Sequence, residues 1–398
     1  MLLKNEKIDF DEKDIEDVET NDEKINEKYI KGEVRIVTEQ ARYPLNTIPL
    51  MLETNKYELN PDFQRRRRWS NEKKSKLIES FIMNVPIPPI FLYENEYSHY
   101  EVMDGLQRLT TIADFYRDNF ELTGLKLWQE LNGRTYSKLP EKIKQGIDRR
   151  YISSIILLQE SAKTESKAKF MKQMVFERIN SGGVKLEPQE TRNALYDGKM
   201  NQLCSQLSRN KNLCYFLKIP NDDEVKEGKL NDLQNNEIYR KMGEVEYVLR
   251  FFAMRQLEGY SQRKLSEFLD FYLNKANQFD DNLLENLKRI FEETIELAYD
   301  LLGECAFYMY RKRTMKGERA KWSWYSRTTT TIYDPMMQSL SKLIKKKKIL
   351  LSHKTDVRKE IKEFYKAHYD VFEGRNNNKS DIEQRIVLLD EFFAKFVG

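Results

Sequence analysis

The stretch YEVMDGLQRLTTIADFY (residues 100–116) contains four neighbouring residues whose types suit a phosphate site with a metal ion: Asp104, Gly105, Gln107 and Arg108. This stretch begins with the pattern of a buried strand and continues with the spacing of an amphipathic helix. The free backbone N–H groups and the dipole at a helix start favour anions, and glycine lets a ligand approach the backbone. Arg108 could therefore bind a phosphate, and Gln107 could fix a second oxygen or a water molecule. Asp104 could hold magnesium or orient an attacking water molecule.

A purely structural interpretation of this turn is also open. The carboxylate of Asp104 would cap the helix, and Gly105 would serve the tight turn. Taken alone, the motif does not decide between a ligand site and a helix cap.

A second anion-seeking element is PDFQRRRRWS (residues 61–70), in which four adjacent arginines follow Gln64. Four neighbouring guanidinium groups repel one another, so folding does not require them, whereas phosphate accepts bidentate hydrogen bonds from arginine. The alternative is a solvated basic loop. Trp69, directly after the run, is expected to anchor in the core and not to stack on a base.

A third polar cluster is FERINSGGVKLEPQETRNALY (residues 176–196). Asn180 to Gly183 should end one helix, and Gly182 and Gly183 could form an anion-binding nest. Polar residues then gather around the next helix start: Glu187, Gln189, Glu190, Arg192 and Asn193. A polar corner between two helices explains most of this cluster equally well.

RKRTMKGERAKWSWYSR (residues 311–327) interleaves aromatic side chains with seven basic residues. This pattern is expected where bases stack and phosphates pair. It suggests Arg313, Lys321, Trp322 and Trp324 as nucleic-acid contacts. Aromatic residues packed in a helical core, with solvated lysines around them, are the alternative.

The composition is that of a globular protein with many surface helices: of 398 residues, 33% are charged and 40% hydrophobic. The net charge of +4 does not argue for nucleic acid by itself. Residues 1–35 are acidic and predict a flexible tail or a partner-binding arm. No apolar run long enough for a membrane span and no secretory signal is evident, so we expect a cytoplasmic protein without a membrane partner. The three cysteines lack CxxC spacing and support neither a zinc site nor a disulfide framework.

Hydrophobic periodicity predicts an α+β domain over residues 36–200 and an all-α domain over residues 201–398. In the first, strands are expected at residues 90–93, 99–103 and 151–160, and helices at residues 71–84 and 106–116. Ser70 or Asn71 is a suitable N-cap for the earlier helix. From about Lys199 onward almost every segment has helical periodicity.

Placed in order, the motifs of residues 40–200 resemble the N-terminal domain of GmrSD-type restriction endonucleases. The resemblance implies a ParB/sulfiredoxin-like fold that binds, and often hydrolyses, a nucleotide in prokaryotic restriction-modification and antiviral defence. The family motif DGQQR carries over to Asp104, Gly105, Gln107 and Arg108. Leu106 replaces the first glutamine of the motif, which removes one polar group from the expected pocket.

The resemblance also implies roles for the other two motifs. In ParB-like folds an extended segment ending in arginine precedes the phosphate turn, so Gln64 and Arg65 become candidate phosphate ligands. The family's third motif is matched at the border of the site by Glu177, Arg178, Asn180 and Gly183.

Full-length restriction members carry a C-terminal HNH nuclease domain with an HxxP-like motif. His99, His353 and His368 lack that context, so we expect no HNH nuclease activity from this chain. It would act with a separate nuclease or effector protein, or through its N-terminal domain alone.

The expected function is that of a nucleotide-binding protein, a weak NTPase using magnesium, that interacts with DNA. The expected catalytic residues are Asp104, Gln107 and Arg108, with Asp104 as the metal ligand. The expected nucleotide-binding residues are Gln64, Arg65, Asp104, Gly105, Gln107, Arg108, Asn180 and Gly183. The expected DNA contacts are Arg66, Arg67, Arg68, Arg313, Lys321, Trp322 and Trp324.

Two alternatives remain open at the level of the sequence. One is a non-catalytic DNA-binding or scaffold protein with a vestigial pocket. The other is a ParB-like DNA nickase that holds metal through Asp104 together with Glu177 or Glu190.

Overall fold

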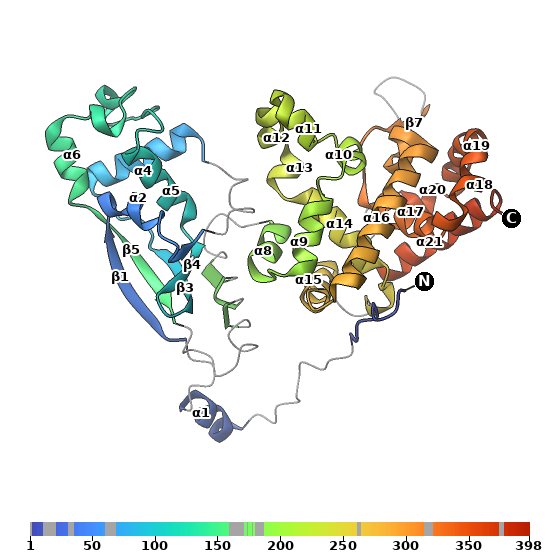
Figure 1. The fold of residues 1–398 in the computed structure, drawn as a ribbon, viewed down its shortest axis with the longest axis horizontal. Helices are drawn as coiled ribbons and strands as arrows, with labels where there is room; N and C mark the ends of the chain where they lie inside the picture. The colour runs from blue at the N-terminus through green and yellow to red at the C-terminus, as the bar shows by residue number, and fades with distance from the viewer. Residues whose placement is uncertain are drawn as a thin grey trace. The chain divides into compact units, whose positions relative to one another are not determined.

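The computed structural model describes most of the chain, in two compact units (Figure 1). The described residues are 2–10, 21–30, 36–59, 69–158, 171–172, 174–176, 178–179, 187–260, 264–313, 321–373 and 378–398. The sheet unit lies within residues 15–195, and the helical unit combines residues 2–10 with the described residues from Tyr196 onward. From the sequence, the boundary between the two domains is expected at residue 200.

The sheet unit is built on a mixed five-stranded sheet with the order β1-β5-β3-β4-β2. Its strands are β1 (Thr38–Pro44), β2 (Tyr57–Glu58), β3 (Ile90–Glu96), β4 (His99–Asp104) and β5 (Tyr151–Leu157). The pairs β1–β5 and β3–β4 are antiparallel, whereas β3–β5 and β2–β4 are parallel. β3 must be extended because Pro86, Pro88 and Pro89 precede or border it and exclude a helix.

Helices cover this sheet and supply much of its core. They are α2 (Ile48–Met51), α4 (Asn71–Met83), α5 (Leu106–Tyr116) and α6 (Glu141–Asp148). In the chain, α1 (Asp22–Ile30) precedes the sheet and α8 (Pro188–Leu195) follows it. Leu109, Ile112 and Phe115 of α5 recur at helical spacing and are completely buried. The side chain of Ser70 caps α4 by accepting a hydrogen bond from Lys73 N–H at 3.4 Å. One apolar face of α5 therefore fixes the turn that precedes it against the sheet.

The helical unit contains thirteen α-helical segments among the described residues. They are α9 (Lys199–Leu207), α10 (Lys211–Leu217), α11 (Asp222–Glu224), α12 (Leu230–Asn235), α13 (Glu237–Arg240), α14 (Gly243–Met254), α15 (Leu265–Ala276), α16 (Asp281–Leu302), α17 (Thr330–Ser341), α18 (Lys347–Ser352), α19 (Lys354–Ala367), α20 (Tyr369–Phe372) and α21 (Lys379–Ala394). The predicted fold class, an α+β part followed by a helical part, is confirmed. In the core of the helical unit, the ring centroids of Phe251 and Phe252 of α14 lie 5.3 and 6.0 Å from that of Phe291 of α16.

One element corrects the expectation of helices throughout. Residues Met309–Arg313 and Lys321–Tyr325 form an antiparallel hairpin, β6–β7. Tyr310 lies opposite Trp324, and Lys312 lies opposite Trp322, so the aromatic residues share one face. The period of two in KWSWY, which the basic residues obscure in the sequence, is the reason for the strand.

The core of the helical unit holds a buried ion pair between α14 and α17. Arg250 Nε lies 3.0 Å from Asp334 Oδ1, and a second guanidinium nitrogen pairs with Asp334 Oδ2. The side chains of Arg250 and Asp334 are 4% and 1% exposed. Such a pair is costly to bury and still more costly to break.

Residues 2–10 pack against the helical unit, which differs from the flexible tail expected for this part of residues 1–35. Glu6 is completely buried and forms a bidentate ion pair with Arg255, at 2.6 and 2.8 Å. The side chain of Gln256 accepts a hydrogen bond from Ile8 N–H at 2.7 Å and donates one to Glu6 O at 2.6 Å. An amide side chain thus binds the segment's backbone as a neighbouring strand would.

Phe10 extends this docking to α15. Its ring lies 5.7 Å from that of Phe268 and 5.3 Å from that of Phe271. A Cβ atom at Gly259 would lie 2.3 Å from Phe10 Cδ2, so the docked segment requires glycine there. The sequence does not reveal that this segment docks, because exposed polar residues alternate with the buried ones along it.

Among the residues that the structure describes, no helix is long and apolar enough to cross a membrane.

Candidate nucleotide site

The turn between β4 and α5 is fixed by the backbone of Gly105. β4 ends at Asp104, α5 begins at Leu106, and Gly105 has a φ of 101°. A Cβ atom on Gly105 would lie 2.4 Å from Ile90 Cγ2 of β3. The glycine therefore serves both the turn and close packing on the sheet, in agreement with the structural interpretation of this position.

Replacing Gly105 with alanine is expected to destabilise the sheet unit by about 2–3 kcal/mol, because the left-handed backbone and the contact with Ile90 both oppose a side chain. Urea unfolding of the variant and wild type measures this loss. Gly133→Ala is a matched control, since Gly133 also has a positive φ of 78° but has nothing within 4 Å of an added Cβ. Equal losses in the two variants would show that packing on Ile90 contributes nothing.

Asp104 and Arg108 form an ion pair one helical turn apart. The distance from Arg108 NH2 to Asp104 Oδ2 is 2.6 Å, and the same nitrogen donates to Pro89 O at 3.2 Å. The side chains are 15% exposed for Arg108 and 38% exposed for Asp104. Arg108 Nε is buried and finds no acceptor among the described residues. The carbonyl of Pro89 was not foreseen as part of the site, although the extended proline run before β3 points to it.

The start of α5 has no side-chain cap among the described residues. Gly105 is the N-cap of this helix. The capping by Asp104 that the structural alternative suggests is absent from the described structure, where its carboxylate binds Arg108 instead. Backbone N–H groups at an uncapped start, next to a guanidinium group, form a donor set that suits phosphate.

Gln107 connects this turn to the end of the arginine run. Its Oε1 accepts a hydrogen bond from Trp69 N–H at 3.4 Å. Trp69 also packs against the hydrophobic core, as expected, and Lys73 Nζ lies 4.6 Å from its ring centroid. The residue that follows the four arginines is thus held beside the turn. The candidates Gln64, Arg65, Arg66, Arg67 and Arg68 themselves lie outside the described residues.

Comparison with known families agrees with this part of the fold. Residues 48–196 match the family described as GmrSD restriction endonuclease, N-terminal domain. This segment is a GmrSD-type N-terminal domain. No curated protein and no solved structure matches the chain.

Leu106 in the GmrSD-type domain lies in the hydrophobic core and is 6% exposed. From the sequence, leucine in place of glutamine is expected to remove a polar group from the pocket. In this structure the position faces the core, so the substitution leaves Gln107 and Arg108 at the turn unchanged.

The polar residues around α8 form a network within their own helix. Gln189 Nε2 donates to Asn193 Oδ1 at 2.9 Å, and Arg192 NH1 donates to Gln189 Oε1 at 3.1 Å. Glu190 is buried and accepts a hydrogen bond from Glu187 N–H at 2.8 Å. Glu190 thus stabilises the start of α8, which argues against its use as the second metal ligand of a nickase. Glu177, Asn180 and Gly183 lie outside the described residues, and Arg178 is exposed.

A magnesium ion in the GmrSD-type domain would depend on Asp104 and on the nucleotide. Within the described part of the chain, no three His, Cys, Asp or Glu side chains are grouped to hold a metal. Magnesium often takes only one or two carboxylates and completes its shell with phosphate oxygens and water. The partly exposed carboxylate of Asp104 suits that arrangement, and Arg108 beside it, whose Nε has no acceptor among the described residues, suits the phosphate.

The strand pairing places the expected DNA contacts of the hairpin on two opposite faces. Arg313 pairs with Lys321 across the hairpin, on the face opposite to the aromatic residues. Trp322 lies 5.9 Å from Tyr310 and 5.2 Å from Tyr369, measured between ring centroids. These half-buried contacts favour the alternative in which the aromatic rings serve packing.

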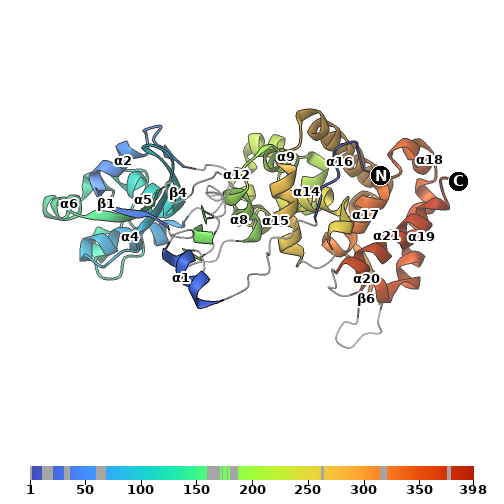
Figure 2. The same ribbon diagram turned by 90° about the horizontal axis from the view of Figure 1, so that it is seen from below.

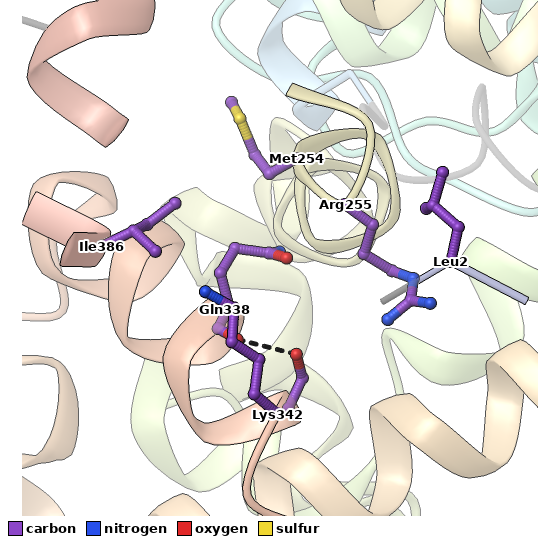
Figure 3. Close-up of a pocket in the computed structure, with 7 residues that line it drawn as sticks. Leu2, Met254, Arg255, Gln338, Lys342 and Ile386 are labelled. Atoms are coloured by element: carbon purple, nitrogen blue, oxygen red, sulfur yellow. Dashed lines mark hydrogen bonds between the residues drawn. The ribbon is translucent and has the colours of Figure 1, made fainter. Parts of the chain in front are cut away.

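A cavity of about 150 Å³ lies in the helical unit, apart from the GmrSD-type domain (Figure 3). It is lined by Leu2, Met254, Arg255, Gln338, Ser341, Lys342 and Ile386. Pockets for drug-sized ligands usually have volumes of roughly 300–1,000 Å³, so this cavity is too small for a nucleotide.

Proposed function

We propose that the GmrSD-type domain binds the phosphates of a nucleoside triphosphate at the turn between β4 and α5. The chain would use this nucleotide, with magnesium and slow hydrolysis, in a DNA-interacting function of restriction type. The observation that carries the proposal is the Arg108 guanidinium at the start of α5, where the described residues supply neither a side-chain cap nor an acceptor for the buried Nε.

The roles of the three polar side chains follow from their positions. Arg108 would exchange its contact with Asp104 for a phosphate group, which, like a carboxylate, accepts bidentate hydrogen bonds from arginine. Asp104 would then be released to hold magnesium or to orient water. Gln107, whose Oε1 accepts a hydrogen bond from Trp69 N–H, would hold Trp69 beside the turn and could fix a second phosphate oxygen or a water molecule.

Replacing Arg108 with alanine is expected to weaken nucleotide binding about 10- to 150-fold, the value of one lost hydrogen bond to a charged group. Isothermal titration calorimetry with ATP, GTP, CTP and UTP, each with magnesium, measures this change. Arg117→Ala is the control, because Arg117 lies at the other end of α5 and pairs with Glu53 on the surface. Thermal melting of each apo variant separates lost binding from lost folding.

Two results would refute the proposal. One is wild-type protein that binds none of the four nucleotides. The other is an Arg108→Ala variant that binds as tightly as Arg117→Ala.

A DNA-binding or scaffold protein with a vestigial pocket is the second candidate. The 2.6 Å pair between Asp104 and Arg108 favours it, because each group already neutralises the other without a ligand. In that case DNA affinity would be the same with and without nucleotide, and Arg108→Ala would leave it unchanged.

A further inference from the structure

Positive charge is concentrated in one region of the helical unit. Residues 309–368 contain 17 lysines and arginines and five acidic residues, a net charge of +12 (17 minus 5). The whole chain has a net charge of +4, so all other residues together carry −8. A region this basic within a chain that is nearly neutral indicates an anionic partner for that region.

Helix α19 arranges part of this charge in a row. Lys354, Arg358, Lys362 and Lys366 are each four residues apart and therefore lie along one side of the helix. Each step rises about 6 Å, which gives a row about 18 Å long. The other flank of the helix carries the acidic residues Asp356, Glu360 and Glu363.

Several cations of this region have no ionic partner. No carboxylate of a described residue lies within 4 Å of Lys312, Lys354, Lys359 or Lys362, and all but the half-buried Lys354 are exposed. Two other members of the row are engaged. Lys366 pairs with Glu363 at 2.8 Å, and Arg358 Nε donates to Leu301 O at 2.7 Å.

The aromatic face of the hairpin holds this row in place. Trp324 lies 6.1 Å from Tyr365 of α19, and Trp322 lies 5.2 Å from Tyr369 of α20, between ring centroids. β6 and α20 therefore lie beside the end of α19 (Figure 2). Arg358 ties the middle of α19 to the end of α16. The cations are presented by a rigid support, and the tryptophans act as its anchors.

We propose that a basic strip consisting of Lys312, Lys354, Lys359 and Lys362 binds the phosphate backbone of double-stranded DNA. The inference rests on the DNA interaction of the proposed function and assigns it to α19 and β6 in place of the tryptophans. Lys354 and Lys362 are eight residues apart, about 12 Å along α19, which would span about three phosphates of one DNA strand at about 3.4 Å per phosphate along the axis. Lysines without partners provide charge but no base readout, so binding through the strip is independent of sequence.

The test replaces all four lysines of the basic strip with glutamine in the full-length chain. Fluorescence anisotropy with a 20-base-pair duplex is measured over a series of salt concentrations. We expect the variant to bind at least about tenfold more weakly at low salt, and the slope of log K against log [salt] to flatten by about 0.9 for each lost contact.

A matched control carries the same loss of charge in the sheet unit. Lys76, Lys126, Lys138 and Lys142 are all exposed there and are replaced with glutamine together. The control is expected to keep both the wild-type affinity and the wild-type slope. The basic strip is refuted if the control loses as much affinity as the strip variant, if the strip variant binds like wild type, or if wild type does not bind the duplex.

Two further measurements isolate the inference from the proposed nucleotide site. Calorimetry is expected to give the strip variant the same nucleotide affinity as wild type. If wild type binds DNA through the strip but binds no nucleotide, only the nucleotide site is refuted. A single-stranded RNA of equal length is expected to bind more weakly than the duplex. RNA binding of equal strength would overturn the assignment to double-stranded DNA.

Discussion

Replacing Arg250 with methionine is expected to lower the free energy of unfolding of the helical unit by about 3–5 kcal/mol. Asp334 is 1% exposed, so the variant leaves a carboxylate in the core without its bidentate partner. Arg385 of α21, another cation near Asp334, donates from its Nε to Val371 O. Urea unfolding, followed by circular dichroism, gives the change directly.

The double variant Arg250→Met, Asp334→Leu is the decisive control. Replacing a whole buried ion pair with apolar residues of similar volume is often neutral or stabilising, whereas removal of one partner is not. The double variant should therefore recover most of the loss. A single variant that costs less than about 1 kcal/mol would contradict the inference that the pair is buried and essential.

The loss in the single variant should also depend on pH, because burial already raises the pKa of Asp334 despite the opposing effect of Arg250. Without Arg250 this pKa should rise further, and the folded state then binds a proton that the unfolded state releases. Stability of the single variant therefore falls as pH increases from the unfolded pKa to the folded pKa. The cost should be smaller at about pH 5 than at about pH 8.

The parts of the fold that the sequence predicts are those with local causes. Ser70 followed by an apolar stripe predicts α4 and its cap, and Pro88 and Pro89 exclude a helix before β3. The strand-to-helix turn at Gly105 is likewise visible from its immediate neighbours. Each of these features depends on residues only a few positions apart.

Features that depend on distant residues were not predictable. Nothing near Glu6 in the sequence shows that Arg255, almost 250 positions later, will bury it. In the same way, the ion pair of Asp104 with Arg108 follows from spacing, but the carbonyl of Pro89 joins it only because β3 lies beside β4. The core position of Leu106 also needs the packing of α5 on the sheet. The same local residues can form either a helix cap or a ligand site, and only such long-range contacts distinguish the two.

Replacing Glu6 with alanine is expected to release residues 2–10 from the helical unit. Arg255 is 5% exposed and would lose a bidentate partner, and breaking a buried pair in this way costs about 3–5 kcal/mol. Undocking of a short terminal segment lets Arg255 reach water and avoids most of that cost, so local release should precede global unfolding. Hydrogen exchange at the amide of Ile8, which donates to Gln256, reports the release. Lys4→Ala, at an exposed position of the same segment, should leave the exchange rate unchanged.

Gly259→Ala tests the same docking from the opposite side. The backbone of Gly259 is outside the left-handed region, so alanine is locally tolerated, and the strain comes from Phe10, whose ring would lie 2.3 Å from the new Cβ. This variant should therefore also speed exchange at Ile8. Adding Phe10→Ala removes the clash, so the second substitution should cost less in the Gly259→Ala background than in wild type, which a double-mutant cycle measures. Additive effects would mean that Phe10 does not occupy the space beside Gly259, and the docked position of residues 2–10 would then be wrong.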